Sequence, residues 1–67
     1  MTEAEAREIL SAYREYDEET DSEYGFRILE CIEQSGSGFL FKCQPDESTE
    51  VCILAVYPGG LVLTPPT

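Results

Sequence analysis

The sequence predicts an α+β domain in which one N-terminal helix packs on a three- to four-stranded antiparallel β-meander. Apolar residues recur every three or four positions near the N-terminus, as on one face of a helix, and from Tyr24 they alternate with polar residues, as in strands. Segments rich in glycine and proline separate the alternating stretches. We expect residues 1–67 to form a single domain, because a chain this short has material for only one core.

The helix is expected over residues 3–17. Thr2 and Glu5 have the spacing of a capping box, in which a hydroxyl and a carboxylate bind free backbone N–H groups at the start of a helix. Continuing the helix further would turn Asp17 toward the apolar face, so the helix should end at about this residue. The apolar face consists of Ala6, Ile9, Leu10, Tyr13 and Tyr16.

Four strands are expected, and they should be joined as antiparallel hairpins. "SGSG" and "YPGG" supply turns, because glycine adopts positive φ without strain and Pro58 fixes its own φ. The segment that begins the sheet also fits a helical period. The expected strands are residues 25–34, 39–44, 51–57 and 61–64.

Side-chain alternation sets the register of these strands. A four-residue loop over "SGSG" places Phe41 opposite Ile32. Pairing across the "PDESTE" loop places Phe41 beside Leu54, and by the same pairing Cys43 lies beside Cys52. The face expected to meet the helix gathers Phe26, Ile28, Ile32, Phe39, Phe41, Leu54, Val56, Leu61 and Leu63.

The other face of the sheet is expected to carry Leu29, Leu40, Ile53, Ala55, Tyr57 and Val62. One helix cannot cover both faces of a sheet. This second face therefore either meets a partner or another copy of the chain, or the sheet curls enough to close over it. We expect a monomer, or a weak homodimer that forms through this apolar face.

The chain is strongly acidic, with 14 acidic residues, 4 basic residues, no histidine and a formal net charge of -10. This charge excludes nucleic acids and anionic membranes as direct ligands and favours a cationic partner. Cys31, Cys43 and Cys52 show no Cys-x-x-Cys spacing, so we expect reduced thiols in a cytoplasmic protein. No apolar run approaches the ~20 residues of a membrane span, and the N-terminal segment is acidic where a secretion signal is basic.

No constellation of residues indicates catalysis. Cysteine and serine nucleophiles lack a histidine base, and Glu30, the only carboxylate expected on the buried side of a strand, can reach solvent at the edge. The alternating acids of "DEETDSE" resemble a calcium loop. Counting from Asp17, however, the positions that need glycine and glutamate hold Ser22 and Ile28. We therefore expect no enzymatic activity, no metal site and no cofactor.

The acidic run "REYDEETDSEYG" and the "PDESTE" loop are the features that indicate a partner. At the C-terminal end of a helix each carboxylate is unfavourable by ~0.3–1 kcal/mol, which points to a role beyond stability, although solvated surface is the alternative. Glu8, Glu15 and Glu19 would form an outward stripe on the helix. Rows of carboxylates resemble the phosphates of DNA and fit the basic grooves that bind it. The candidate partner-binding residues are Glu8, Glu15, Asp17, Glu18, Glu19, Asp21, Glu23, Asp46, Glu47 and Glu50.

A small, strongly acidic, histidine-free domain with these two segments resembles the phage-borne anti-CRISPR proteins that act as DNA mimics on type I effector complexes. The resemblance covers the size and composition of the whole chain and includes no diagnostic motif. It implies a non-catalytic inhibitor in the cytoplasm of a bacterial host, where it would block DNA binding by covering a channel lined with lysine and arginine.

A second class of protein also fits the pattern. One helix followed by a meander with "SGSGFLF" and "VYPGGLVLTP" is similar to the small immunity proteins of bacterial toxin systems, which often present an acidic face to a basic nuclease. Both resemblances imply a basic protein partner and no catalysis. An acidic housekeeping or salt-adapted domain is the third alternative.

Overall fold

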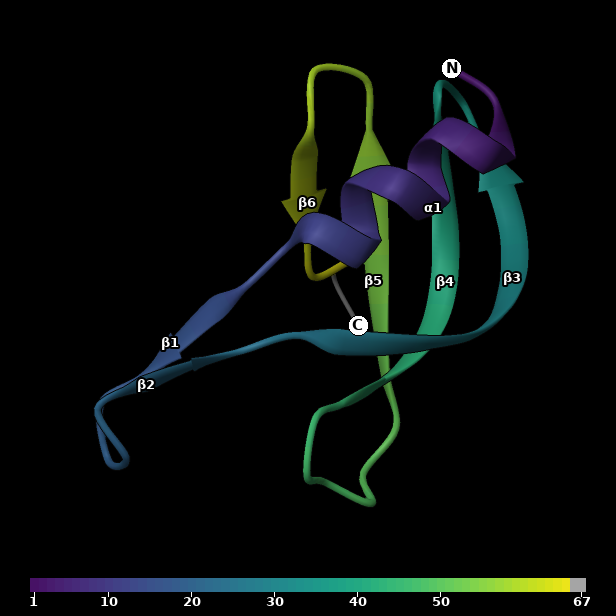
Figure 1. Ribbon diagram of the computed structural model, residues 1–67. Helices are drawn as coiled ribbons and strands as arrows, with labels where there is room; N and C mark the ends of the chain where they lie inside the picture. Colours follow the sequence, from purple (N-terminus) through teal and green to yellow (C-terminus); the bar gives the residue numbers. More distant parts are fainter. Residues whose placement is uncertain (66–67) are drawn as a thin grey trace.

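One α-helix lies across one face of a four-stranded antiparallel sheet, and a two-stranded hairpin connects the helix to the sheet (Figure 1). This computed structural model describes residues 1–65. The α+β class is confirmed. The elements are α1 (Glu3–Ala12), β1 (Glu15–Asp17), β2 (Ser22–Tyr24), β3 (Phe26–Ser35), β4 (Gly38–Pro45), β5 (Cys52–Tyr57) and β6 (Leu61–Leu63).

The four-stranded sheet has the order β3-β4-β5-β6, so every strand pairs with its neighbour in sequence. Each of its strands begins and ends within one residue of the range that the sequence predicts. The β1–β2 pair is a separate sheet that the sequence analysis does not predict. Over residues 1–65, no helix is long and apolar enough to cross a membrane.

Helix α1 begins where the sequence predicts and ends earlier. The Thr2 hydroxyl accepts a hydrogen bond from the Glu5 backbone N–H at 3.2 Å, as an N-cap should. The predicted end at residue 17 is wrong, because the helix stops at Ala12 and Tyr13 is already extended, with ψ 138. Arg14 binds the carbonyl groups freed at this end: its Nη1 donates to the Ser11 oxygen at 2.9 Å and to the Tyr13 oxygen at 2.8 Å.

The residues that would have extended the helix form the β1–β2 hairpin instead. Its register pairs Glu15 with Tyr24 and Asp17 with Ser22. Backbone pairing between the two strands replaces the lost helical hydrogen bonds. The predicted opposition between acidic side chains and the negative end of the helix is therefore wrong, because the helix has already ended before the acidic run.

Two β-bulges in β3 change which of its side chains face the helix. The predicted pairs Phe41 with Leu54 and Cys43 with Cys52 are confirmed, but Phe41 lies opposite Cys31 and not Ile32. Irregularities between Ile28 and Glu30 and between Cys31 and Glu33 each add one residue to β3, which breaks the period of two. Ile32, expected in the core, is 46% exposed as a result. Figure 1 shows how strongly β3 bends along its length.

The turn before β4 and the side-chain directions in β6 differ from expectation. Ser35 pairs with Gly38, so the loop between β3 and β4 has two residues and not four, with Gly36 at φ 59. Val56 pairs with Val62, which places Val62 on the helix-facing side of the sheet and leaves Leu61 and Leu63 on the opposite side. The expected positions of these three residues on the two faces are therefore reversed.

The core lies between α1 and the sheet. Tyr13, at the end of α1, stacks on Phe26 at the start of β3 with ring centroids 5.8 Å apart. No polar or charged side chain among the described residues is buried. Burial of apolar surface is therefore what holds the helix on the sheet. The buried cluster comprises Ala6, Leu10, Phe39, Phe41, Cys43, Leu54 and Val56.

Candidate acidic binding surface

The β1–β2 hairpin extends away from the sheet and carries most of the acidic run (Figure 1). Over residues 1–65, ion pairs join Arg7 to Glu3 at 2.8 Å and Lys42 to Glu30 at 4.0 Å. Neither pair involves the hairpin. Its carboxylates are therefore neutralised by no basic side chain of the described chain. The acidic residues of the hairpin are Glu15, Asp17, Glu18, Glu19, Asp21 and Glu23.

Glu15 stabilises the hairpin and faces inward. Its two carboxylate oxygens accept hydrogen bonds from the Tyr13 hydroxyl at 2.6 Å and from the Tyr24 hydroxyl at 2.9 Å. These bonds favour the protonated phenols, so the pKa of Tyr13 is raised to about 12 and the pKa of Tyr24 is raised in the same direction. Glu15 thus joins the end of α1 to β2, and its carboxylate is already occupied.

The turn at the tip of the hairpin is held by its own side chains. Asp17 Oδ1 accepts a hydrogen bond from the Glu19 backbone N–H at 2.9 Å, and Asp21 accepts one from the Tyr16 hydroxyl, which raises the pKa of Tyr16. Asp21 adopts φ 52, a conformation that aspartate tolerates better than most residues. Glu18 and Glu19 are exposed at this tip, and no hydrogen bond of the described residues involves their carboxylates.

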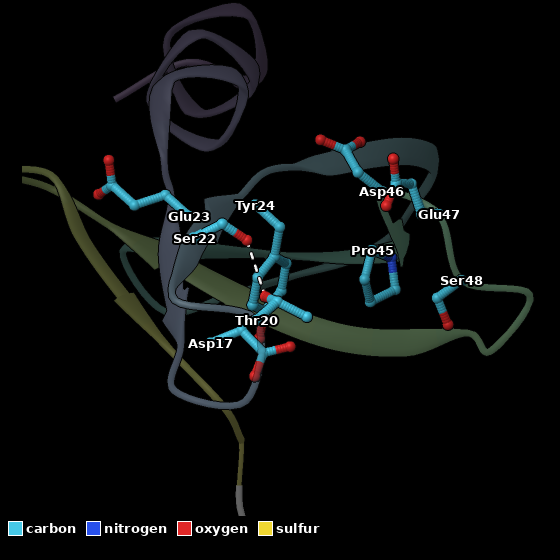
Figure 2. Close-up of a pocket in the computed structure, with 9 residues that line it drawn as sticks. All are labelled: Asp17, Thr20, Ser22, Glu23, Tyr24, Pro45, Asp46, Glu47 and Ser48. Carbon is cyan, nitrogen blue, oxygen red and sulfur yellow. Dashed lines mark hydrogen bonds between the residues drawn. The ribbon is translucent and has the colours of Figure 1, made fainter.

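A groove of about 530 Å³ separates the hairpin from the loop between β4 and β5 (Figure 2). Figure 2 shows the hairpin residues Asp17 and Thr20 on one side and Pro45 and Ser48 on the other. The Glu23 carboxylate points away from the loop. The groove thus combines an acidic rim with a phenol ring and a proline ring. Its lining residues are Asp17, Thr20, Ser22, Glu23, Tyr24, Pro45, Asp46, Glu47 and Ser48.

Two hydrogen bonds connect the hairpin side of the groove to the loop side. The Gly25 backbone N–H donates to Asp46 Oδ2 at 3.0 Å, and the Asp46 backbone N–H donates to the Gly25 carbonyl at 2.9 Å. Glycine at position 25 leaves room for the Arg14 guanidinium, because a Cβ there would lie 2.8 Å from Arg14 Nη1. This junction ties the hairpin to the β4–β5 loop and places the two acidic segments on either side of one groove.

Glu47 occupies the third position of a β-turn. The Ser48 backbone N–H donates to the Pro45 carbonyl at 3.1 Å, which closes the turn, and Glu47 adopts φ 64. Glycine is the residue that this position favours, and a glutamate there is strained. An exposed carboxylate is therefore held on the rim of the groove at a cost in stability.

The structure brings together only part of the predicted surface. Asp17, Glu23, Asp46 and Glu47 line the groove, and Glu18, Glu19 and Asp21 lie at the hairpin tip beside it. Glu8 lies on α1 and Glu50 lies in the β4–β5 loop outside the groove lining. The predicted stripe of Glu8, Glu15 and Glu19 does not exist, because the last two residues lie beyond the helix.

The uncharged lining of the groove was not predicted from the sequence. Tyr24 follows an acidic residue, and Pro45 precedes one. The pairs "YG" and "PD" mark the two segments of the chain that meet at the junction. Local patterns of this kind predict turns. They do not predict that two turns separated by 21 residues share a hydrogen-bonded pair.

The chemistry available to this surface is binding of positive charge. In the part of the chain described, no three side chains of histidine, cysteine, aspartate or glutamate gather as ligands for one metal ion. Burial raises the pKa of the Cys43 thiol to about 11 and raises that of Cys52, so both thiols are protonated at neutral pH. Comparisons with protein-family models, curated proteins and solved structures find no match to this chain.

Proposed function

We propose that the protein is a non-catalytic inhibitor that inserts its acidic hairpin into a basic, nucleic-acid-binding groove of a partner protein. The observation that carries this proposal is the hairpin itself, a projecting element whose tip carboxylates have no basic partner within residues 1–65. Because like charges repel, such a cluster disfavours folding and becomes favourable when a cationic surface meets it.

The dimensions of a β-hairpin suit this role. Residues of an antiparallel strand advance by ~3.4 Å and point alternately to opposite faces, so side chains on one face lie ~6.8 Å apart. A two-stranded ribbon is also narrow enough to enter a groove. The hairpin is therefore a narrow projection that can carry its tip carboxylates into a basic groove.

Glu47 supports the same proposal independently of the hairpin. Its strained φ of 64 lowers stability, and a position of this kind is retained where the surrounding structure or a function requires it. Its carboxylate lies on the groove rim across from the hairpin. We include Asp17, Glu18, Glu19, Asp21, Glu23 and Glu47 in the contact surface, with Asp46 holding the loop in place.

The partner that we propose is a type I CRISPR effector complex in the cytoplasm of a bacterial cell, with the protein acting as an anti-CRISPR inhibitor. A basic nuclease toxin is the second candidate, which would make the protein an immunity protein. The unpaired acidic tip favours both partners over a housekeeping role, because a solvated surface needs no concentration of charge on one projecting element.

The test is competition between the protein and duplex DNA for a purified type I effector complex. The variant E18K/E19K reverses two carboxylates that make no side-chain hydrogen bond within the described chain. It should weaken inhibition by ~10- to 100-fold. The matched control is E8K/E33K, which changes the net charge equally away from the hairpin, at two exposed residues whose carboxylates make no hydrogen bond within the described chain, and it should inhibit nearly as well as the wild type.

Circular dichroism and thermal melting establish that both variants fold. Inhibition by the wild type should weaken as salt rises, since the Debye length shortens to ~8 Å at 0.15 M. Equal losses in the two variants would mean that overall charge matters and the hairpin does not. A wild-type protein that fails on the effector complex but neutralises a basic nuclease, with the same loss in E18K/E19K, would assign the second candidate.

A further inference from the structure

Two of the three cysteines lie opposite each other on the neighbouring strands β4 and β5 (Figure 1). The antiparallel register pairs Cys43 directly with Cys52, and both are free thiols. Side chains of directly opposed residues point to the same face of a sheet. Cys43 lies in the buried cluster under α1, and Cys52 packs against that cluster. The two sulfur atoms are therefore on the same side of the sheet.

The spacing of this pair fits a disulfide. Opposed residues of antiparallel strands have Cα atoms ~4.5 or ~5.5 Å apart, and disulfides join cysteines whose Cα atoms are ~4.4–6.8 Å apart. The two thiols also influence each other. Burial and then the charge of Cys52 raise the pKa of Cys43 to about 11, and a hydrogen bond with Cys43 opposes the rise that burial causes in the pKa of Cys52. The strands thus hold the thiols within reach of one bond.

Cys31 lies outside this pair. It is opposite Phe41, two residues along β4 from Cys43. Diagonal neighbours of this kind are ~7–8 Å apart, beyond the range of a disulfide. The whole width of β4 separates Cys31 from Cys52, because the strand order is β3-β4-β5, and two strand spacings are ~9–10 Å. The fold therefore favours one of the three possible pairings.

We propose that Cys43 and Cys52 are a redox-sensitive pair that closes an intramolecular disulfide and stabilises the folded chain, with Cys31 remaining a free thiol. The oxidant is a low-molecular-weight disulfide such as oxidised glutathione. The proposal goes beyond the proposed function and does not depend on the identity of the partner.

The reaction proceeds by two exchanges. Cys52, the more exposed of the two residues, loses its proton and attacks one sulfur of the oxidant, which releases one small thiolate. Cys43 is 0% exposed, so the oxidant does not reach it, but its thiolate can attack the Cys52 sulfur and release the second small thiolate. The protein gives up two protons and two electrons, and the oxidant is reduced to two thiols.

The bond closes a ring around the loop between β4 and β5, which carries Asp46 and Glu47 of the groove. Closing a loop of about ten residues restricts the unfolded chain and should raise the melting temperature by ~10 °C in a domain of this size. Only thiolates attack disulfides, and both thiols have raised pKa values. The pair therefore responds to sustained oxidation.

The experiment is oxidation of the purified, folded protein by excess oxidised glutathione at about pH 8.5. The remaining thiols are alkylated after denaturation, and the products are mapped by mass spectrometry. Cleavage after glutamate separates the three cysteines, because Glu33 and Glu47 lie between them. The protein should be lighter by two hydrogen atoms before alkylation, with a peptide pair that joins Cys43 to Cys52 and an alkyl group on Cys31.

The matched control is the same oxidation in urea. An unfolded chain joins its cysteines according to loop length, so the link between Cys43 and Cys52 should make up only about half of the products, against nearly all of them in the folded protein. Folded C31S should oxidise like the wild type. C52S should form no intramolecular link, and C43A should stop at a glutathione adduct on Cys52.

Thermal unfolding supplies the second measurement. The oxidised wild type and oxidised C31S should melt ~10 °C higher than their reduced forms, dithiothreitol should reverse the shift, and C52S should show none. The proposal is overturned if the folded protein gives the same mixture of links as the unfolded chain, separate glutathione adducts alone, or a link that needs Cys31. An oxidised form that melts no higher than the reduced one would also overturn it, because the bond would then distort the strands.

Discussion

The β1–β2 hairpin and the four-stranded sheet are held in place by different forces. In the sheet, Phe41 and Val56 are 0% exposed and pack against α1. In the hairpin, Tyr16 is 57% exposed, and the element is fixed by the bonds of Glu15 to two tyrosines. Buried apolar surface thus stabilises the sheet, whereas polar contacts worth ~0.5–1.5 kcal/mol each orient the hairpin.

The comparison shows how a chain this acidic folds at all. The unpaired carboxylates lie on the element that contributes no residue to the buried core, so their repulsion acts where little stability is at stake. Changes of charge on the hairpin should alter binding while the fold persists. Changes in the sheet should unfold the protein and remove function indirectly.

Phe41→Ala should have the largest effect on stability. The ring is fully buried beside Leu54, and its removal leaves a cavity that costs ~3–5 kcal/mol. The matched change in the hairpin, Tyr16→Ala, should cost less than ~1 kcal/mol, although it loses the hydrogen bond to Asp21. Urea denaturation of both variants measures the difference. Similar costs would show that the hairpin belongs to the same cooperative core.

Alkaline pH should destabilise the sheet before it destabilises the hairpin. Burial raises the pKa of Cys43 from 9.0 to about 11, so above pH 9 the unfolded chain loses a proton that the folded chain keeps. This contribution to stability is complete below pH 9 and is lost as pH rises to about 11. Tyr13, whose pKa is raised from 10.0 to about 12, adds a loss of the same sign at higher pH.

Two variants separate these contributions in urea denaturation at stepped pH. Cys43→Ala should reduce the earlier part of the alkaline loss, to which Cys52 also contributes, and keep the later part. Tyr13→Phe should keep the earlier part and shorten the later one. If both variants retain the wild-type pH profile, other groups control the alkaline transition.

Gly25→Ala should disturb the junction between the two regions by ~1–2 kcal/mol, the scale of the two hydrogen bonds at risk. The added Cβ would displace the Arg14 guanidinium, whose Nη1 donates to the carbonyls of Ser11 and Tyr13. In an Arg14→Ala background the same change should cost much less, because nothing remains to be displaced. Additive costs in this double-mutant cycle would contradict the clash as the cause.

The sequence predicts the sheet better than the hairpin, because apolar burial stabilises the sheet and polar contacts between distant residues fix the hairpin. Apolar residues that alternate along a segment indicate which side chains are buried, and apolar burial is what builds the sheet. The "YPGG" segment predicts a turn, and the spacing of Thr2 and Glu5 predicts the start of the helix. The hairpin depends on Glu15 meeting Tyr24, nine residues away, and on Gly25 meeting Asp46. No local period encodes these contacts, so the apolar spacing of Tyr13 and Tyr16 wrongly extended the helix.

The bulges of β3 were unpredictable from alternation alone, although the sequence contains a trace of them. Leu29 and Ile32 are each adjacent to an apolar residue that faces the core, and adjacent apolar pairs do not fit a regular strand. The acidic residues were all visible, but their grouping was not. The structure does not place Glu8 and Glu15 with the other predicted contact residues, because the fold, and not the charge pattern, decides which carboxylates face solvent together.

The smallest expected effect has the opposite sign and tests whether charge on the groove rim is kept at the expense of stability. Glu47→Gly should raise stability by ~0.5–1 kcal/mol, because glycine adopts the positive φ without strain. Glu50→Gly in the same loop is the control. Glu50 does not have positive φ, so glycine there should lower stability through the flexibility of the unfolded chain. Thermal unfolding of both variants gives the two signs.

Substitutions of Glu47 also test whether stability and binding oppose each other at this position. Glu47→Gly should weaken inhibition of a basic partner while it stabilises the fold, because the carboxylate that it removes lies on the groove rim. Glu47→Asn, which removes the charge and also tolerates positive φ, should likewise weaken inhibition and stabilise the fold. If Glu47→Gly instead destabilises the protein, the glutamate contributes to the loop, and its strained position no longer argues for a role in binding. A more stable variant with full inhibition would confine the contact surface to the hairpin.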